Sequence, residues 1–352
     1  MLPAGSTASF AVRFRPLGPW RFGPDSGARD RVDLIYHSDA VFSAVCSAMS
    51  QLGLGEDWLE ATARSEAAPA ARFSSFYPFQ GHTLLVVPPR SIWPPQEAAK
   101  IRYKGARFVP LPVVESLLAG KGIDENRWAV DGESECLIPH DAGRGPFRIA
   151  LRSNASVDRL DAGKVESHAT ACLEFAQNAG LWTVVQFADA AAQEKWEAPV
   201  RSAFLLLADS GFGGERSRGW GRSETPEWQH WTPPGMPPGT PPGMPPAAPE
   251  AAEDSPEQAH WLLSLYLPSS DDLVDWKRGS YSTLTRRGRI ESRARWGEIK
   301  APTLMVAEGS VLLSAASQLR GEARDTAPAG FPHPVYRAGF AVTVPIPWRA
   351  SS

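Results

Sequence analysis

The chain has 352 residues, of which 43% are hydrophobic and 21% are charged, and these values predict a globular protein of two domains. The formal net charge of −3 argues against a protein that coats nucleic acid non-specifically, but it leaves room for a local basic groove. The 3 cysteines lie far apart without a CxxC pair, which predicts reduced thiols and no zinc framework. There is no secretory signal and no apolar run near the ~20 residues that span a bilayer, so we expect a cytoplasmic protein without membrane contact.

The first half of the chain is predicted to alternate strands and helices. Residues 8–16 alternate apolar and polar side chains, as a half-buried strand does. Residues 38–53 place their apolar side chains on one helical face, with Ser38 as the expected N-cap. Two buried strands are expected at 82–89 and 181–189; a second helix at 194–211, which Gly211 closes, and a last strand in SETPEWQHW follow them.

This order predicts an α+β protein whose first domain, residues 1–231, has the ferredoxin-like (RRM-like) βαββαβ fold. Residues of about 90–178 form an insertion, in which the basic segment 99–108 is expected to project as a short hairpin. Residues 232–257 contain a PPGx repeat and an acidic tract, which predict an extended linker. Residues 258–352 are expected to form a second, smaller ferredoxin-like domain.

The segment GFGGERSRGWGR, residues 211–222, combines five glycines with three arginines. It lacks the lysine of a phosphate-binding P-loop. Arg216 stands at the third glycine position of a dinucleotide-binding fingerprint, and the segment follows a helix instead of opening one. Two interpretations remain: a flexible surface loop, or a nest of backbone N–H groups that holds phosphates.

A nest flanked by guanidinium groups can hold a phosphodiester backbone without reading its sequence. Other basic tracts, at 13–31, 99–107 and 285–300, are each typical of a solvated face, but together they favour a groove for single-stranded RNA. The candidate RNA-binding residues are Gly211, Gly213, Gly214, Arg216, Ser217, Arg218, Gly219, Gly221 and Arg222 in the loop, and Arg21, His37, Ser38, Arg102, Tyr103, Lys104, Arg107, Arg286 and Arg287 elsewhere.

The glycine-rich segment resembles the glycine-rich loop of the RAMP proteins of CRISPR effector complexes. Other segments resemble, in the family's order, the RAMP subunit of the type III-A (Csm) complex that caps the 5′ tag of the guide RNA (crRNA). These segments are HSDAVFSAVCSAM (37–49), SSFYP (74–78), RGSYSTLTRRG (278–288), MVAEGSVLL (305–313) and HPVYRAGFAVTVP (333–345). The PPGx linker departs from the family pattern.

The resemblance implies a non-catalytic scaffold without metal or cofactor. Such a subunit holds the repeat-derived tag, bridges the large polymerase/cyclase subunit to the first backbone RAMP subunit, and meets target RNA only indirectly. It implies that Gly213, Gly214, Arg216, Ser217 and Gly219 line the tag. The segment from Arg102 to Arg107 would then be the thumb near the junction of tag and guide.

Three alternatives stay open. Some RAMP relatives cleave CRISPR repeats without metal, and His37 before the first predicted helix could serve as their general base. The chain could also be the equivalent capping subunit of a type III-B complex. Finally, it could be a protein-only adaptor whose basic tracts meet acidic neighbours. A metal site is not expected, because Asp39 suits the first turn of a helix and the pair in PHD (139–141) lacks further ligands.

Overall fold

The computed structural model describes residues 9–24, 26–95, 101–157, 163, 165–235, 258–292 and 296–348. Most of the predicted proline-rich linker, from residue 236 to 257, lies outside the described residues. None of the helices in the described ranges is long and apolar enough to cross a bilayer.

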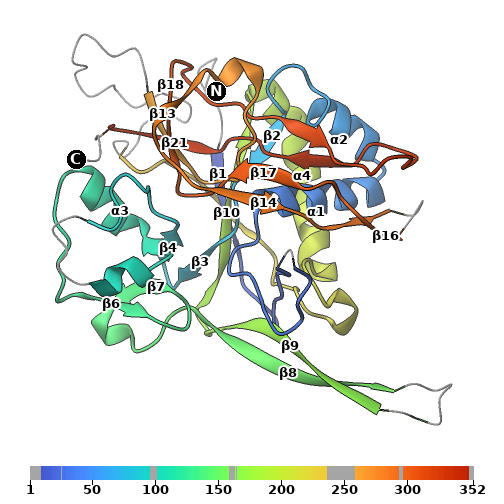
Figure 1. Ribbon diagram of the computed structural model, residues 1–352, viewed down its shortest axis with the longest axis horizontal. Helices are drawn as coiled ribbons and strands as arrows, with labels where there is room; N and C mark the ends of the chain where they lie inside the picture. Colours follow the sequence, from blue (N-terminus) through green and yellow to red (C-terminus); the bar gives the residue numbers. More distant parts are fainter. Residues whose placement is uncertain are drawn as a thin grey trace.

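The first half of the chain builds an antiparallel sheet with the strand order β11-β1-β10-β3-β4-β5, and β2 also pairs with β10 (Figure 1). Its strands are β1 (Ser9–Phe14), β2 (Ala71–Phe73), β3 (Tyr77–Gln80), β4 (Thr83–Val86), β5 (Val109–Pro110), β10 (Ala179–Phe187) and β11 (Glu227–His230). The strands predicted at 8–16, 82–89, 181–189 and after the glycine-rich segment are thus confirmed.

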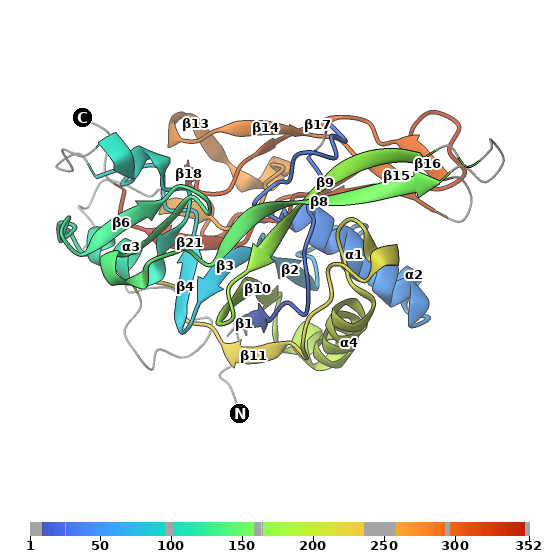
Figure 2. The same ribbon diagram turned by 90° about the horizontal axis from the view of Figure 1, so that it is seen from below.

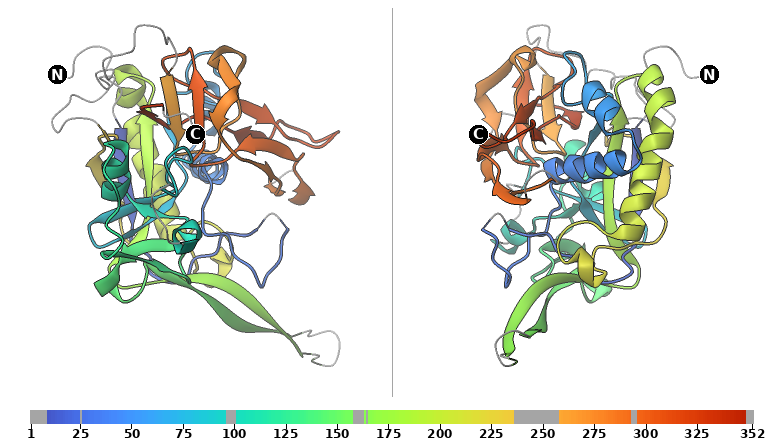
Figure 3. Two further views of the ribbon diagram at one scale, coloured as in Figure 1. Left: turned by 60° about the vertical axis from the view of Figure 1, so that its left-hand side comes forward. Right: turned by 90° about the vertical axis from the view of Figure 1, so that its right-hand side faces the viewer.

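The helices α1 (Ser38–Gln51) and α4 (Ala190–Ser210) pack against each other on one face of this sheet, next to the short α2 (Gly55–Ala61) (Figure 3). Both predicted helices are confirmed, and Gly211 ends α4 with a φ of 81°. The predicted N-cap at Ser38 is wrong by one position. His37 occupies the cap position without a side-chain cap, and the Ser38 hydroxyl instead accepts a hydrogen bond from the Leu265 N–H at 3.0 Å.

The insertion contains a small lobe and one long hairpin. The lobe holds α3 (Leu111–Leu118), β6 (Trp128–Asp131), β7 (Cys136–Pro139) and the 3₁₀ turn η2 (His140–Ala142). The strands β8 (Phe147–Val157) and β9 (Val165–Phe175) form a hairpin that projects far from the body (Figures 1 and 2).

The hairpin predicted at 99–108 is wrong. Its described part is the 3₁₀ turn η1 (Ile101–Gly105), in which the Tyr103 ring is buried and packs 6.2 Å from the Trp93 ring. The Tyr103 hydroxyl donates to the Glu125 carbonyl at 3.4 Å. An apolar side chain that is buried in the body of the lobe cannot belong to a solvated arm.

The second half builds a four-stranded antiparallel sheet with the order β13-β18-β12-β21. Its strands are β12 (Gln258–Leu262), β13 (Val274–Ser280), β18 (Val311–Ser314) and β21 (Thr343–Ile346). Three two-stranded ribbons accompany it: β14 (Thr283–Arg286) with β17 (Thr303–Val306), β15 (Arg289–Glu291) with β16 (Trp296–Ile299), and β19 (Ala323–Asp325) with β20 (Tyr336–Ala338). The described residues from 258 onward contain the 3₁₀ turn η4 (Ser270–Asp272) but no α-helix, although the βαββαβ pattern expected there has two.

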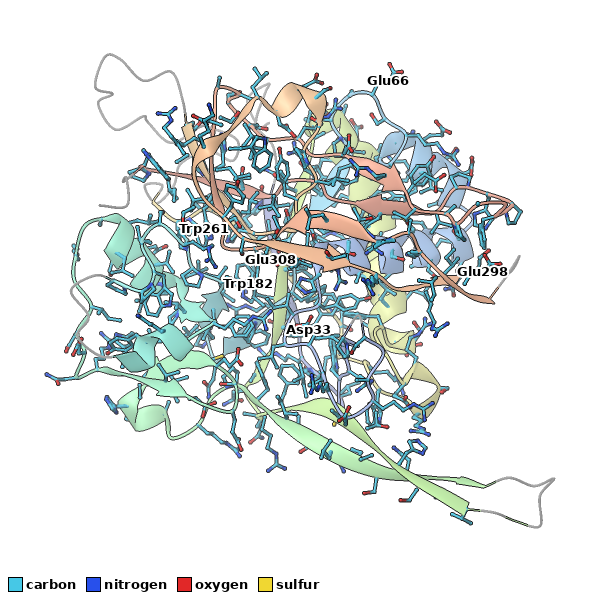
Figure 4. The ribbon with its side chains drawn as sticks, viewed as in Figure 1. Asp33, Glu66, Trp182, Trp261, Glu298 and Glu308 are labelled. Carbon is cyan, nitrogen blue, oxygen red and sulfur yellow. The ribbon has the colours of Figure 1, made fainter. Side chains whose placement is uncertain are left out.

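One apolar core joins the two sheets. It includes Trp182 of the first sheet and Trp261 of the second, whose side chains are fully buried. Their indole N–H groups donate to the carbonyls of Leu85 and Val87 at 2.8 and 3.1 Å, so both tryptophans hold β4 and the residue after it (Figure 4). Since each sheet covers apolar side chains of the other, separating the two halves would expose a large apolar area.

Candidate nucleic-acid interface

The glycine-rich segment folds tightly against the protein itself. Gly221 has a φ of 80°, and a Cβ there would lie 2.1 Å from the carbonyl oxygen of Phe212. Gly213 has a φ of 88°, and a Cβ there would lie 2.5 Å from the carbonyl oxygen of Arg21. Both positions therefore exclude other residues for a structural reason, the close approach of two backbones.

Half of the amides in this segment, six of the 12, donate to carbonyls of the protein. The N–H of Gly214 donates to Arg21 at 2.8 Å, and that of Gly221 donates to Pro19 at 3.0 Å. In the described part of the chain, the N–H groups of Gly213 and Glu215 donate no backbone hydrogen bond. Part of the nest that the glycine count predicted is therefore used inside the protein, and side chains add further donors for a ligand.

Those side chains lie on an exposed turn, η3 (Arg216–Arg218), which left-handed residues at Glu215 and Gly219 bracket. Arg218 is ion-paired with Glu215 at 2.9 Å, and Arg222 is ion-paired with Asp209 at 3.3 Å. Exposed pairs of this kind contribute only about 0–1 kcal/mol, so a phosphate can replace the carboxylate at little cost. We call Arg216, Ser217, Arg218 and Arg222 the arginine turn.

The segment 17–22 joins the arginine turn to the long hairpin. Trp20 exchanges two backbone hydrogen bonds with Leu173 of β9, at 3.0 and 2.7 Å. On its other side, the Trp20 indole N–H donates to the Arg222 carbonyl at 3.1 Å. The arginine turn therefore lies beside the base of the β8–β9 hairpin, as Figures 2 and 3 show.

The hairpin itself has two chemically different faces, because alternate residues of a strand point to opposite sides. Arg148 and Arg152 share one face and both pair with Glu174 on the opposite strand. The other face exposes the aliphatic side chains Ile149 and Leu151. Sequence reasoning missed this hairpin, although FRIALRSNASV alternates in the required way.

His37 is buried in a charged cluster and does not lie on the exposed surface. Its Nδ1 lies 2.7 Å from Glu308 Oε1 and its Nε2 lies 3.1 Å from Asp33 Oδ2; Figure 4 labels both carboxylates near the centre of the molecule. The Ser75 hydroxyl donates to Glu308 as well, and Arg107 approaches Asp33 at 3.7 Å. Burial alone would lower the pKa of His37, but the carboxylates of Glu308 and Asp33 outweigh it and raise this pKa to about 9.

This cluster predicts a pH dependence of stability. A pKa raised from its ordinary 6.5 to about 9 in the folded state gives stability that is complete below about pH 6.5 and is lost as pH rises through about 9. We expect the free energy of unfolding to fall over this window by at most about 1.4 kcal/mol per pH unit from His37. In urea unfolding, His37→Gln should flatten this slope; an unchanged slope would contradict the assignment.

Arg286 and Ser38, both candidate RNA contacts, are used inside the protein. Arg286 is buried and donates to Asp39 from Nε at 3.2 Å and from Nη2 at 3.1 Å. Arg337 donates to the same carboxylate. Ser38 is buried and accepts from the second half of the chain. Neither side chain can reach RNA without breaking a contact between the two halves.

Arg21 is also structural. Its side chain is buried, and its guanidinium donates to four carbonyls within 3.0 Å, those of Ala28, Arg29, Arg31 and Ala171. Burial lowers its pKa from the usual value. Arg21 thus fixes the loop after Trp20 to β9. For this reason, the number of basic residues in 13–31 overstated how many of them are available to RNA.

The remaining candidates divide by exposure. Tyr103 is buried, whereas Lys104 and Arg287 are exposed and Arg107 is half-buried. The side chain of Arg102 lies outside the described residues. The exposed cations of the predicted site are thus the three arginines of the arginine turn, together with Lys104 and Arg287. Arg107 is half-buried at the edge of the His37 cluster.

The comparisons with known proteins agree with a mixed fold of few helices and antiparallel sheets. Residues 255–346 match the family model described as the CRISPR Csm4 C-terminal domain. The match covers this part of the chain and, together with the solved structures below, supports the resemblance to a type III-A RAMP subunit.

Solved structures extend the likeness over nearly the whole chain. A chain of the Csm3–Csm4 subcomplex of the type III-A CRISPR–Cas interference complex is 16% identical, with a TM-score of 0.60, covering 96% of this chain and 99% of that one. A chain of a Csm1–Csm4 cassette in complex with cA4 is 17% identical, with a TM-score of 0.57, covering 97% and 99%. At such identities the likeness shows the fold. No curated protein sequence is significantly similar.

Proposed function

We propose that the protein is the guide-capping subunit of a type III-A effector complex. It would hold the repeat-derived 5′ tag of the crRNA and bridge the large polymerase/cyclase subunit to the first backbone subunit, in the cytoplasm. The observation that carries this proposal is the full-length likeness to chains solved with Csm1 or with Csm3, together with the Csm4 C-terminal match. A type III-B role is not favoured by these findings.

The fold of the first half supports this function. Among its strands β1, β3, β10 and β11, which are the first to fourth in the sequence, the order across the sheet is fourth, first, third, second. This is the strand order of a βαββαβ unit. The second sheet has the same order with loops in place of helices. We therefore regard the protein as two ferredoxin-like units, the sheet architecture on which single-stranded RNA is often bound.

The arginine turn is the proposed grip on the tag. Its guanidinium groups suit phosphate oxygens, as do amides such as those of Gly213 and Glu215, which donate no backbone hydrogen bond. Such contacts position RNA without reading bases. The β8–β9 hairpin beside it takes the thumb role that we first assigned to residues 102–107, because it is the element that projects from the insertion.

Repeat cleavage by His37 is not favoured. A general base needs a free lone pair within reach of substrate, yet both ring nitrogens contact carboxylates and the side chain is buried. We propose that the protein is not an enzyme, and we expect repeat RNA incubated with it in EDTA to stay intact. Cleavage that His37→Gln abolishes would contradict this.

Reconstitution tests the bridging role. The large subunit, the backbone subunit and a tagged guide RNA are mixed with or without this protein and separated by size. We expect one particle that holds all four components, and loss of the large subunit from the guide when the protein is omitted. A large subunit that joins the guide and backbone equally well without the protein would contradict the proposal.

A further inference from the structure

The edge strand β13 carries a bulge outside the RNA site. Asp275 pairs with Leu313 and Ser280 pairs with Val311, so four residues of β13 face a single residue of β18. Bulges in edge strands re-aim side chains and block pairing with other strands. We call residues 273–281 the β13 knob.

The knob is held in one conformation by its own side chains. Asp275 accepts from the Lys277 N–H at 2.9 Å and from Arg278 Nε at 2.8 Å. The Tyr281 hydroxyl donates to the Trp276 carbonyl at 3.3 Å and closes the bulge. The Trp276 and Tyr281 rings meet edge to face with centroids 5.5 Å apart. Such preorganisation reduces the entropy lost when a surface binds a partner.

Large apolar side chains nevertheless face solvent here. Leu273 is 65% exposed, Trp276 is 41% exposed and Tyr281 is 38% exposed. Leu273 also adopts left-handed backbone, with φ 43° and ψ 44°, which is costly for leucine. A strained, exposed leucine three residues from an exposed tryptophan gives no benefit to the isolated chain, so the observations point to a bound partner.

The local charges favour protein over RNA as that partner. The acids Asp271 and Asp275 balance Arg278 and Arg320, with which they are ion-paired, and Lys277 adds one positive charge at the rim. A phosphate backbone needs a stronger positive field. Tryptophan, tyrosine and arginine around a small apolar centre are the composition of protein–protein hot spots.

The position of the knob supports the same choice. In Figure 1 the β13 strand lies at the upper left of the molecule, and the β8–β9 hairpin, which the arginine turn adjoins, projects at the opposite, lower end. A backbone subunit that follows the guide RNA has to contact the RNA side. The large polymerase/cyclase subunit does not continue along the guide, so it is the partner that we expect on the far side.

We propose that the β13 knob is the hot spot for the large polymerase/cyclase subunit, which presents an apolar socket with an acidic rim. This inference rests on the proposed function. Leu273, Trp276 and Tyr281 fill the socket, and Lys277 meets the rim. Rim charges mainly set the association rate, and buried aromatic residues mainly set the dissociation rate.

The test measures binding of the full chain to the purified cognate large subunit by biolayer interferometry. The variant combines Trp276→Ala with Leu273→Asn; asparagine accepts the left-handed backbone, so the knob keeps its fold. The control is Leu205→Ala on α4, a leucine that is 47% exposed and lies outside the knob. We expect about a 30-fold weaker Kd for the double variant and no change for the control.

Two further readouts separate the possible failures. Binding of the guide together with the backbone subunit should be unchanged in the double variant, and Lys277→Glu should slow association with the large subunit. Equal affinity of wild type and double variant for the large subunit would overturn the inference alone. A variant that loses guide RNA instead would place RNA on the knob and also overturn it. A wild-type chain that does not bind the large subunit would overturn the proposed function as well.

Discussion

Replacing Asp39 with alanine is expected to lower the free energy of unfolding by about 3–5 kcal/mol, because it leaves buried guanidinium groups without a counter-charge. Arg286 and Arg337 are both buried and both donate to this carboxylate. Burial alone would raise the pKa of Asp39, but the two arginines outweigh it and lower this pKa to about 2. Since α1 carries Asp39 and the second half carries both arginines, the loss should loosen the joint between the two halves. Urea unfolding at about pH 7 measures this loss of free energy of unfolding.

The matched control for this prediction is Asp57→Ala. Asp57 is also an acid in the first turn of a helix, α2, but it is exposed. A surface substitution of this kind should stay within about 0.5 kcal/mol of wild type. If Asp39→Ala and Asp57→Ala lost equal stability, the buried ion pairs would not be the joint that we describe.

Combined replacement of Arg216 and Arg218 by alanine is expected to weaken binding of tag RNA by about 100-fold. Each charge-assisted hydrogen bond to phosphate contributes roughly 1.5 kcal/mol, and two such contacts are lost. The plot of log K against log salt should also become shallower by about two units, one for each phosphate contact. Fluorescence anisotropy with a labelled tag RNA, at several salt concentrations, measures both quantities.

A double variant with the same charge change controls for net charge. Arg127 in the insertion lobe and Arg324 in β19 are exposed arginines outside the arginine turn. Their replacement by alanine should leave the salt slope nearly unchanged. An equal effect of the two double variants would mean that RNA follows the overall charge and not the arginine turn.

The regular elements of the first half could be predicted because their periodicity is local. Residues 8–16 and 38–53 carry their pattern within one element, and Gly211 marks the end of α4 by a conformation that its neighbours impose. The same reasoning failed at 99–108, since alternation around Gly105 does not reveal that Tyr103 is buried against Trp93.

The candidate site was harder to predict, because the position of a charged residue in the sequence does not show which residue it pairs with in the fold. Arg286 and Asp39 are separated by 247 residues, and only the fold shows that they neutralise each other. The Arg21 guanidinium likewise donates its hydrogen bonds to carbonyls of a loop and of β9. The arginines at 216, 218 and 222 remained exposed because the tight glycine backbone turns them outward. The sequence shows that the segment is rich in arginine, but it does not show which arginines of the chain are exposed and which are used inside the protein.

Crosslinking of the guide in the assembled particle tests the RNA contact most directly. A guide with 4-thiouridine at single tag positions is irradiated in the reconstituted particle, and the crosslinked peptides are identified by mass spectrometry. We predict crosslinks from the tag to residues 211–222 and to the neighbouring segment 17–22. Tag crosslinks that fall only on other subunits, or on surfaces of this protein remote from the arginine turn, would contradict the account.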